Sequence, residues 1–371
     1  MRIAMLAPIN WPLPPDGYGP WELVASNLTE ALVALGHEVT LFAAGGTRTT
    51  ATLVATTPHA LETWPEAERN RRREFDPESG LLEGPPDARV LEQLHIAMCM
   101  ERAATGEFDV VHSHLHVHAL VFGRLVDCPI VTTLHGSAWN RATHPILRAY
   151  RHMPFVSLSD AERMFLPELN YVATVPNGIR LDAFPVCRDK DDFLLFAGRL
   201  APEKGPDTAI EVARRAGRRL VIAGMVEPQH EGFFDQRIKP HLDSGVVDFV
   251  GLLCQRDLVP YLQKAAAVLF LGRWHEPFGL SAVEAQACGT PLIATRRGAL
   301  PEIIIHGRTG FVADTVDDAV EAVTQLHTID PAACRANAES RFSDDAMARG
   351  YQDVYAAVRR APRTRPASPG V

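Results

Sequence analysis

The fold is indicated first by residues 3–42, IAMLAPINWPLPPDGYGPWELVASNLTEALVALGHEVTLF. This stretch opens with an apolar run at Ile3–Pro8 that has no helical period, which is typical of a buried strand. A loop rich in proline and glycine follows, and apolar residues then recur at helical spacing over 23–35. The next apolar run is Val39–Phe42. A helix between two strands predicts a βαβ unit with parallel strands.

The alternation of strands and helices continues through the chain in two series. The first adds predicted strands at Phe108–His112, Ile130–Leu134, Phe155–Leu158 and Val172–Pro176, and a helix at Ala88–Ala104. The second starts near Asp192, with strands at Phe193–Ala197, Leu220–Ala223, Val247–Val250, Val268–Leu271 and Pro291–Ala294, and helices at Asp207–Ala216 and Leu280–Ala287. We therefore predict an α/β protein of two doubly wound domains. Ligands should bind at the carboxyl ends of the strands, in a cleft between the domains.

The chain has 371 residues, which at about 150 residues per domain also favours two domains. We place the boundary near 177–191, which gives an N-terminal domain over 1–180 and a C-terminal domain over 181–342. A last helix over 343–360 is expected to dock back onto the N-terminal domain. The tail 361–371 is rich in proline and arginine, and we expect it to be disordered.

Composition excludes several classes of protein. Hydrophobic residues make up 46% and charged residues 22%, which excludes a mainly disordered chain. The net charge of −8 argues against nucleic-acid binding. No apolar run approaches the roughly 20 residues of a membrane span, and the first residues do not resemble a signal peptide. The six cysteines form no C-x-x-C pair, so we expect reduced thiols in a cytoplasmic protein.

The segment Glu276–Glu284, EPFGLSAVE, is the strongest candidate for chemistry. A helix that begins near Ser281 would present free backbone N–H groups and a positive dipole end, which suit a phosphate. Glu284, on the first turns of that helix, could accept hydrogen bonds from two ribose hydroxyls. The structural alternative is that Glu284 only complements the helix dipole and that Glu276 is a surface residue.

The segment Gly198–Gly205, GRLAPEKG, follows a predicted strand directly. Arg199 and Lys204 would then lie at the carboxyl end of that strand, where a diphosphate could bind. Arginine supplies a planar fork of donors and lysine a compact charge. The alternative is an exposed basic loop.

Glycines between the first strand and the first helix, Gly17 and Gly19, would let the backbone approach a ligand closely. The segment 16–20 is not the G-x-G-x-x-G fingerprint, and no acidic residue occupies the usual ribose position after the second strand. A dinucleotide cofactor is therefore disfavoured.

Histidines follow two predicted strands. His135 comes directly after Ile130–Leu134, which places it at the ligand-binding edge of the sheet. Four histidines alternate after another strand, a spacing that resembles a metal-ligand set; they are His112, His114, His116 and His118. No cysteine or carboxylate joins them, and the chain is expected to turn into a helix there. We therefore favour packed histidines, with His114 near the ligand, over a metal site.

A basic segment, Arg69–Arg73, lies in the irregular region 47–86. We interpret it as a solvated charged face, with an anion-binding acceptor site as the alternative.

Several of these motifs together resemble family 4 of the retaining glycosyltransferases. They are Glu276-x₇-Glu284, Gly198-Arg199 with Glu203-Lys204-Gly205, Gly17 and Gly19, Val175–Gly178 and Ala287–Pro291. The resemblance covers almost the whole chain and implies the GT-B fold of two Rossmann-like domains that face a central cleft. The sequence departs from the family pattern at Arg180, where an acidic residue is usual. It also departs at 273–275, where Arg-Trp-His replaces a stretch that often holds serine or threonine.

The resemblance also implies roles for individual residues. Arg199 and Lys204 would neutralise the donor's diphosphate, Glu284 would bind the ribose and Glu276 would contact the donor sugar. The backbone amides of Phe278, Gly279 and Leu280 would bind sugar and phosphate, Gly17 and Gly19 would close over the phosphates, and His135 would lie near the sugar.

The implied reaction is hexosyl transfer from a UDP- or GDP-sugar to the hydroxyl of a carbohydrate, lipid or small-molecule acceptor. Stereochemistry would be retained by attack on the same face, without a cofactor or divalent metal. A sugar-nucleotide epimerase, a phosphorylase and a non-catalytic nucleotide-sugar-binding protein are the alternatives. No nucleic acid or transmembrane partner is expected.

Overall fold

The computed structural model describes residues 1–17, 19–66, 74–76, 81–83 and 86–360. The chain divides into two compact units, Met1–Ser157 with Leu166–Ala173 and Ala348–Val371, and Leu158–Phe165 with Thr174–Met347. Compared with the expected boundary at 180, segments 158–165 and 174–180 lie with the second unit. The tail 361–371 and the basic segment 69–73 lie outside the described residues.

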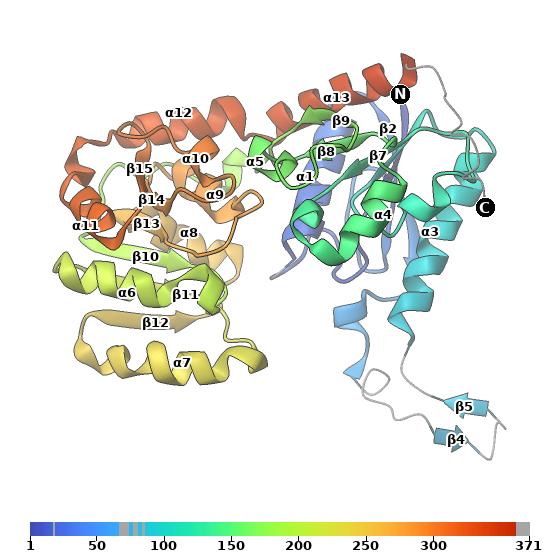
Figure 1. Cartoon of the computed structure of the whole chain (residues 1–371). Helices are drawn as coiled ribbons and strands as arrows, with labels where there is room; N and C mark the ends of the chain where they lie inside the picture. Colours follow the sequence, from blue (N-terminus) through green and yellow to red (C-terminus); the bar gives the residue numbers. More distant parts are fainter. Residues whose placement is uncertain (18, 67–73, 77–80, 84–85, 361–371) are drawn as a thin grey trace. The chain divides into compact units, whose positions relative to one another are not determined.

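A seven-stranded sheet, to which the labelled strands β2, β7, β8 and β9 of Figure 1 belong, forms the first half of the fold. Its strand order is β3-β2-β1-β6-β7-β8-β9. Its strands are β1 Arg2–Leu6, β2 Glu38–Ala44, β3 Thr52–Thr57, β6 Val110–Ser113, β7 Ile130–Thr133, β8 Phe155–Ser157 and β9 Tyr171–Thr174. β1 pairs in parallel with β2 on one side and with β6 on the other, which confirms the predicted βαβ unit. The sequence analysis missed β3, a threonine-rich strand at the edge of the sheet whose first residues are exposed. A separate antiparallel pair is formed by β4 Glu74–Asp76 and β5 Leu81–Glu83.

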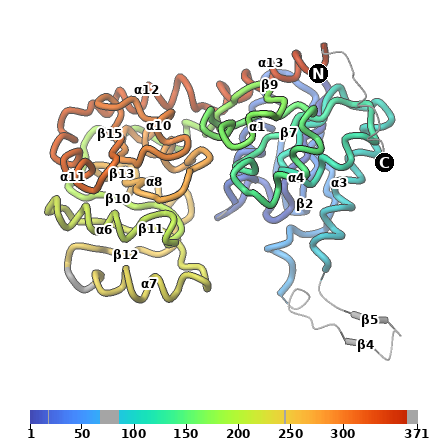
Figure 2. The backbone as a smooth tube through the Cα atoms, viewed as in Figure 1, coloured from blue at the N-terminus to red at the C-terminus, as the bar shows by residue number. Residues whose placement is uncertain are grey.

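The helices that accompany this sheet are α1 Pro20–Ala34, α3 Ala88–Ala104, α4 His144–Ala149 and most of α13, which spans Asp344–Arg360. After α1 the chain turns at Gly36, whose φ of +83° lies in the left-handed region that favours glycine. Within the first unit the end of α13 lies beside the start of β1, because Asp109 pairs with both Arg2 and Arg359 (Figure 2). The last helix therefore belongs in part to the first unit.

The second unit is built on a six-stranded parallel sheet in the order β12-β11-β10-β13-β14-β15. The strands are β10 Phe193–Ala197, β11 Arg219–Ala223, β12 Val247–Gly251, β13 Ala267–Phe270, β14 Leu292–Thr295 and β15 Gly310–Ala313. Its helices are α5 Asp160–Arg163, α6 Pro206–Arg215, α7 Glu231–Arg237, α8 Gln255–Lys264, α9 Leu280–Ala287, α10 Leu300–Ile303, α11 Val316–Thr324 and α12 Pro331–Arg341. The sequence analysis missed β15. The strand order reverses between β10 and β13, and ligands of doubly wound sheets bind at such a switch point.

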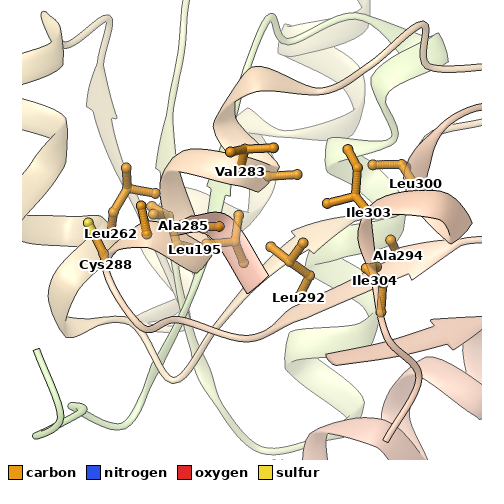
Figure 3. Packing of buried hydrophobic residues seen from close by; sticks show 14 of the residues in the cluster. Leu195, Leu262, Val283, Ala285, Cys288, Leu292, Ala294, Leu300, Ile303 and Ile304 are labelled. Atoms are coloured by element: carbon orange, nitrogen blue, oxygen red, sulfur yellow. The ribbon is translucent and has the colours of Figure 1, made fainter. Parts of the chain in front are cut away.

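The core of the second unit fixes the helix that starts at this switch point. Val283 and Ala285 of α9 are fully buried and belong to one apolar cluster with Leu195 of β10 and Leu292 of β14 (Figure 3). At about 1.5–3 kcal/mol for each large buried apolar side chain, this packing holds α9 firmly on the sheet. The position of Glu284, between these two core residues in the chain, is set by that packing.

Among the described residues, no helix is both long and apolar enough to cross a membrane.

Candidate functional site

The two loops at the switch point of the second sheet bring Lys204 and Glu276 together. Lys204 Nζ lies 2.7 Å from Glu276 Oε2, although the residues are 72 positions apart. Their side chains are only 21% and 15% exposed, so the ion pair is partly shielded from water. The structure therefore makes one charged pair of two residues that were predicted separately.

Close backbone contacts fix the relative position of these loops. The amide of Arg273 donates to the carbonyl of Glu203 at 2.8 Å. Gly205 has a φ of +72°, and a Cβ there would lie 2.3 Å from the carbonyl oxygen of Leu271. Only glycine permits this approach, which explains the glycine that ends the GRLAPEKG segment.

Arg199 also lies in the first of these loops, and its guanidinium is engaged by two carboxylates. It pairs with Glu227 at 2.7 Å and with Glu203 at 3.4 Å. Glu227 was not predicted as a partner, because nothing in the local sequence links it to Arg199. A diphosphate at this edge would share Arg199 with these carboxylates.

The start of α9 offers backbone donors, as the sequence predicts. Gly279 precedes the helix with a φ of +93°, and its carbonyl accepts the first hydrogen bonds, from Ala282 and Val283. The amides of Leu280 and Ser281 come before these bonds and are free of acceptors within the helix. This is the arrangement that binds phosphate or hydroxyl groups at helix N-termini. The neighbouring Phe278 is a core residue that packs against Phe342, so only its backbone can face a ligand.

Glu284 is a buried carboxyl on α9, with 8% of its surface exposed. Burial raises the pKa of Glu284 to about 7. A buried carboxyl of this kind is a recognised mark of a functional site.

This buried carboxyl makes folding stability depend on pH. Its pKa is raised from the ordinary value of 4.5 to about 7 in the folded state, so the folded chain binds this proton more tightly than the unfolded chain. The contribution of the protonated carboxyl to folding stability is therefore complete below about pH 4.5 and is lost as pH rises to about 7. The shift corresponds to about 3 kcal/mol. We expect the free energy of unfolding of Glu284→Gln, minus that of wild type, to rise by about 3 kcal/mol from pH 4.5 to pH 8. The measurement is urea denaturation of both proteins at each pH.

Glu231→Gln, at an exposed position, controls for the loss of one carboxylate. A difference between Glu284→Gln and wild type that stays constant over this pH range would contradict the buried-carboxyl interpretation.

In the first unit, β6 and β7 bring His114 and His135 into contact. His114 Nδ1 lies 2.8 Å from His135 Nε2, and both residues are buried. His135 adopts a φ of +47°, which is unusual for a residue other than glycine, and Gly136 follows at +93°. A strained backbone of this kind is often found at functional sites. Burial and the neighbouring histidines hold the pKa of both imidazoles well below the usual range, so both are neutral at pH 7.

The outer nitrogens of this pair, His114 Nε2 and His135 Nδ1, are buried and have no hydrogen-bond partner among the described residues. One imidazole of the pair must donate the shared hydrogen bond and the other must accept it. In either tautomer, one outer nitrogen is therefore a donor and the other an acceptor. A hydroxyl can donate or accept, so it suits either of the two outer nitrogens.

Two other histidines of this series, His112 within β6 and His118 after it, have side-chain partners of their own. His112 is buried and bonds Tyr355 of α13 and Thr133 of β7, at 2.7 and 2.8 Å. His118 pairs with Glu92 at 2.7 Å. Where a helix was expected, the chain forms a turn and the short 3₁₀ helix Leu120–Phe122. Within the described part of the chain, no group of three or more His, Cys, Asp or Glu residues is placed to hold a metal ion.

The loop before α1 holds the two predicted glycines. Gly19 has a φ of +154°, and a Cβ there would lie 3.0 Å from the side chain of Pro15. Apart from its chain neighbours, no described residue lies within 4 Å of the position that a Cβ would take at Gly17. Gly19 thus has a structural requirement, whereas Gly17 is open to a ligand.

Sequence reasoning missed Glu22, which lies on the first turn of α1. Its side chain is 2% exposed, and Oε1 has no hydrogen-bond partner among the described residues. Burial raises the pKa of Glu22, an effect opposed by hydrogen bonds from backbone amides, including that of Trp11. The signal that the sequence offered for Glu22 was an acidic residue three positions after Gly19.

The chain resembles two groups of proteins over its two halves. Residues 22–183 match Glycosyltransferase Family 4, and residues 181–341 match Glycosyl transferases group 1. A D-inositol 3-phosphate glycosyltransferase of Mycolicibacterium smegmatis is 30% identical over 71% of this chain and 71% of its own length. A glycogen synthase of Mycobacterium tuberculosis is 29% identical over 98% of this chain and 96% of its own.

Among solved structures, Anabaena HepE in complex with UDP and glucose superposes with a TM-score of 0.68. It is 18% identical and covers 96% of this chain and 100% of its own, so this likeness shows the fold alone.

Proposed function

The chain belongs to glycosyltransferase family 4, the glycosyl transferases of group 1, and from this premise we propose that it transfers a hexosyl group from a UDP- or GDP-sugar to an acceptor hydroxyl. One observation carries the proposal. Lys204, Glu276 and the start of α9 converge at the switch point of the second sheet, and Glu284 lies buried one turn further along that helix. Together these groups offer cationic, hydrogen-bonding and ribose-accepting chemistry for one nucleotide sugar.

The chemistry of the leaving group explains why these groups are useful. When the bond between the anomeric carbon and the diphosphate breaks, negative charge grows on the departing phosphate. Lys204, Arg199 and the positive end of α9 would stabilise that charge in place. The acceptor oxygen then bonds to the same face of the anomeric carbon, and its proton passes to the departing phosphate oxygen.

For the first unit we propose that His135 hydrogen-bonds a hydroxyl of the donor sugar and that the backbone at Gly17 and Gly19 binds the phosphates. Support comes from the unpartnered buried nitrogens of His135 and His114 and from the open space at Gly17. Glu22 resembles these histidines in that its side-chain oxygen Oε1 is buried and has no hydrogen-bond partner among the described residues.

The proposed function is tested by a screen of UDP- and GDP-sugars. One donor should raise the melting temperature, since a ligand at 100 times its Kd stabilises the folded state by about 2.7 kcal/mol. The same donor should be slowly hydrolysed to nucleoside diphosphate and free hexose. A binding protein would show the shift without hydrolysis, an epimerase would return an epimerised donor, and a phosphorylase would release sugar phosphate. Any of these three outcomes would overturn the transferase assignment.

We further expect hydrolysis to persist in EDTA, because cationic side chains already face the proposed position of the diphosphate. The measurement compares initial rates with EDTA and with added Mg²⁺ or Mn²⁺. A rate abolished by EDTA and restored by Mn²⁺ would show a metal requirement and contradict the expectation.

A further inference from the structure

Trp274, the middle residue of the stretch 273–275 that departs from the family pattern, contacts both members of the Lys204–Glu276 pair. Its indole Nε1–H donates to Glu276 Oε2 at 3.1 Å. Its ring lies beneath the Lys204 ammonium, with Nζ 4.2 Å from the ring centroid. Lys204 Nζ donates to the same Oε2 at 2.7 Å. Each of the three side chains therefore contacts the other two.

The distribution of these contacts leaves particular atoms available. Both hydrogen bonds reach Oε2, and Oε1 has no hydrogen-bond partner among the described residues. The ammonium has three N–H groups, of which one serves Glu276. The aromatic face attracts the cation but accepts no conventional hydrogen bond, so it holds Lys204 without using up its remaining donors.

Without the indole, both long side chains would gain freedom. A lysine beside a carboxylate can rotate its ammonium toward either oxygen, and both residues lose several rotamers when they are held in one arrangement. Trp274 is itself held in place, because the backbone on either side of it is constrained. Arg273 donates its amide to Glu203, and a Cβ at Gly298 would lie 2.2 Å from the carbonyl oxygen of Glu276.

We propose that Trp274 is a positioning residue for glycosyl transfer. It holds Lys204 and Glu276 Oε2 in the arrangement that leaves the other lysine N–H groups for the diphosphate and Oε1 for the donor sugar. The inference rests on the proposed function and deepens it. It also gives a reason for the departure from the family pattern at 273–275, since serine or threonine offers no aromatic face.

Two substitutions separate the two contacts of Trp274. Trp274→Phe keeps an aromatic face for Lys204 but removes the N–H donor to Glu276. It should lower kcat about tenfold, the effect of losing one hydrogen bond to a charged group, with donor KM within twofold. Trp274→Leu removes both contacts. It should show the same loss in kcat and also raise the donor KM and the Kd for UDP about fivefold.

His275→Ala is the matched control, since it lies in the same loop and its ring packs against Phe165 instead. Its kinetic constants should stay within twofold of wild type. Thermal melts of all variants check folding, and UDP binding by calorimetry follows the Lys204 contact without turnover. In the Glu276→Gln background, Trp274→Phe should cost less than threefold in kcat.

An active wild type with Trp274→Phe and Trp274→Leu both within twofold in kcat, KM and UDP affinity would overturn the positioning role and leave the proposed function intact. Equal losses in Trp274→Leu and His275→Ala would show a general loop effect and would also overturn it. A wild type that neither binds nor turns over any nucleotide sugar would overturn the proposed function instead, together with the inference built on it.

Discussion

Lys204→Ala should lower the rate of sugar transfer by about 10²–10³-fold, the largest effect that we expect from any single substitution. The reason is that a fixed cation acts on charge that grows in the transition state, an interaction worth about 2–4 kcal/mol in a partly shielded site. Lys204 fits this requirement because it is only 21% exposed and is already oriented by Glu276. The measurement is kcat/KM for donor hydrolysis and for transfer.

Arg199→Ala should have an effect of the same kind, since its guanidinium lies in the same loop. Arg199 already pairs with Glu227 and Glu203, so a donor must compete for it and the loss should fall toward the lower end of that range. Lys239→Ala removes an exposed lysine of the same unit and serves as the control, with no change expected. If Lys204→Ala and Arg199→Ala both kept activity within threefold of wild type, the assignment of the diphosphate site would be wrong.

Truncation of Lys204 also strands the carboxylate of Glu276 in a partly buried place, which adds a structural penalty to the chemical one. Lys204→Met paired with Glu276→Gln in a double-mutant cycle separates the two contributions. Direct action of Lys204 on the diphosphate predicts that the Lys204→Met defect persists in the Glu276→Gln background. Full rescue by the second substitution would show that Lys204 acts only through Glu276.

Glu276→Ala, the second large effect, should chiefly lower kcat, by about 10²-fold, with little change in donor KM. The carboxylate is proposed to orient and stabilise the sugar as the anomeric carbon becomes cationic, so its contact matters more in the transition state than in the ground state. Glu276→Gln keeps the shape and one acceptor oxygen, and should retain measurable turnover. A covalent glycosyl adduct on Glu276, detected by mass spectrometry, would make it a nucleophile and overturn this role.

Glu284→Ala should show the opposite pattern, because contacts to ribose hydroxyls persist unchanged between ground and transition states. We expect a raised donor KM with kcat nearly unchanged. Its pKa of about 7 adds a further signature: the carboxylate form accepts two hydroxyl hydrogen bonds, so donor KM should fall as pH rises from 6 to 8. If Glu284→Ala lowered kcat while Glu276→Ala changed only the donor KM, the roles assigned to the two residues would have to be exchanged.

Much of the fold follows from local patterns in the sequence. The βαβ unit at residues 3–42 and the later strands were predictable because a buried parallel strand is a short continuous apolar run. The glycines at 205 and 279 mark backbone conformations that other residues rarely adopt. The family, the two parallel sheets and the motif around Glu276 could all be inferred from residues a few positions apart. Of the two parallel sheets, the missed strands are the edge strands β3 and β15. β3 is threonine-rich with exposed first residues, and β15 is only four residues long.

The tertiary structure decided what depends on contacts between distant residues. Lys204, Trp274 and Glu276 meet only because two loops are joined at one edge of a sheet, and Arg199 finds Glu227 in the same way. The pKa of Glu284 is set by burial, which no single segment encodes. His112 and His114 alternate identically in sequence, yet one bonds α13 and the other bonds His135. The spacing of apolar residues along the sequence determines how each segment folds locally. Desolvation and charge pairing arise only where segments pack together, so the chemistry of the site was decided there.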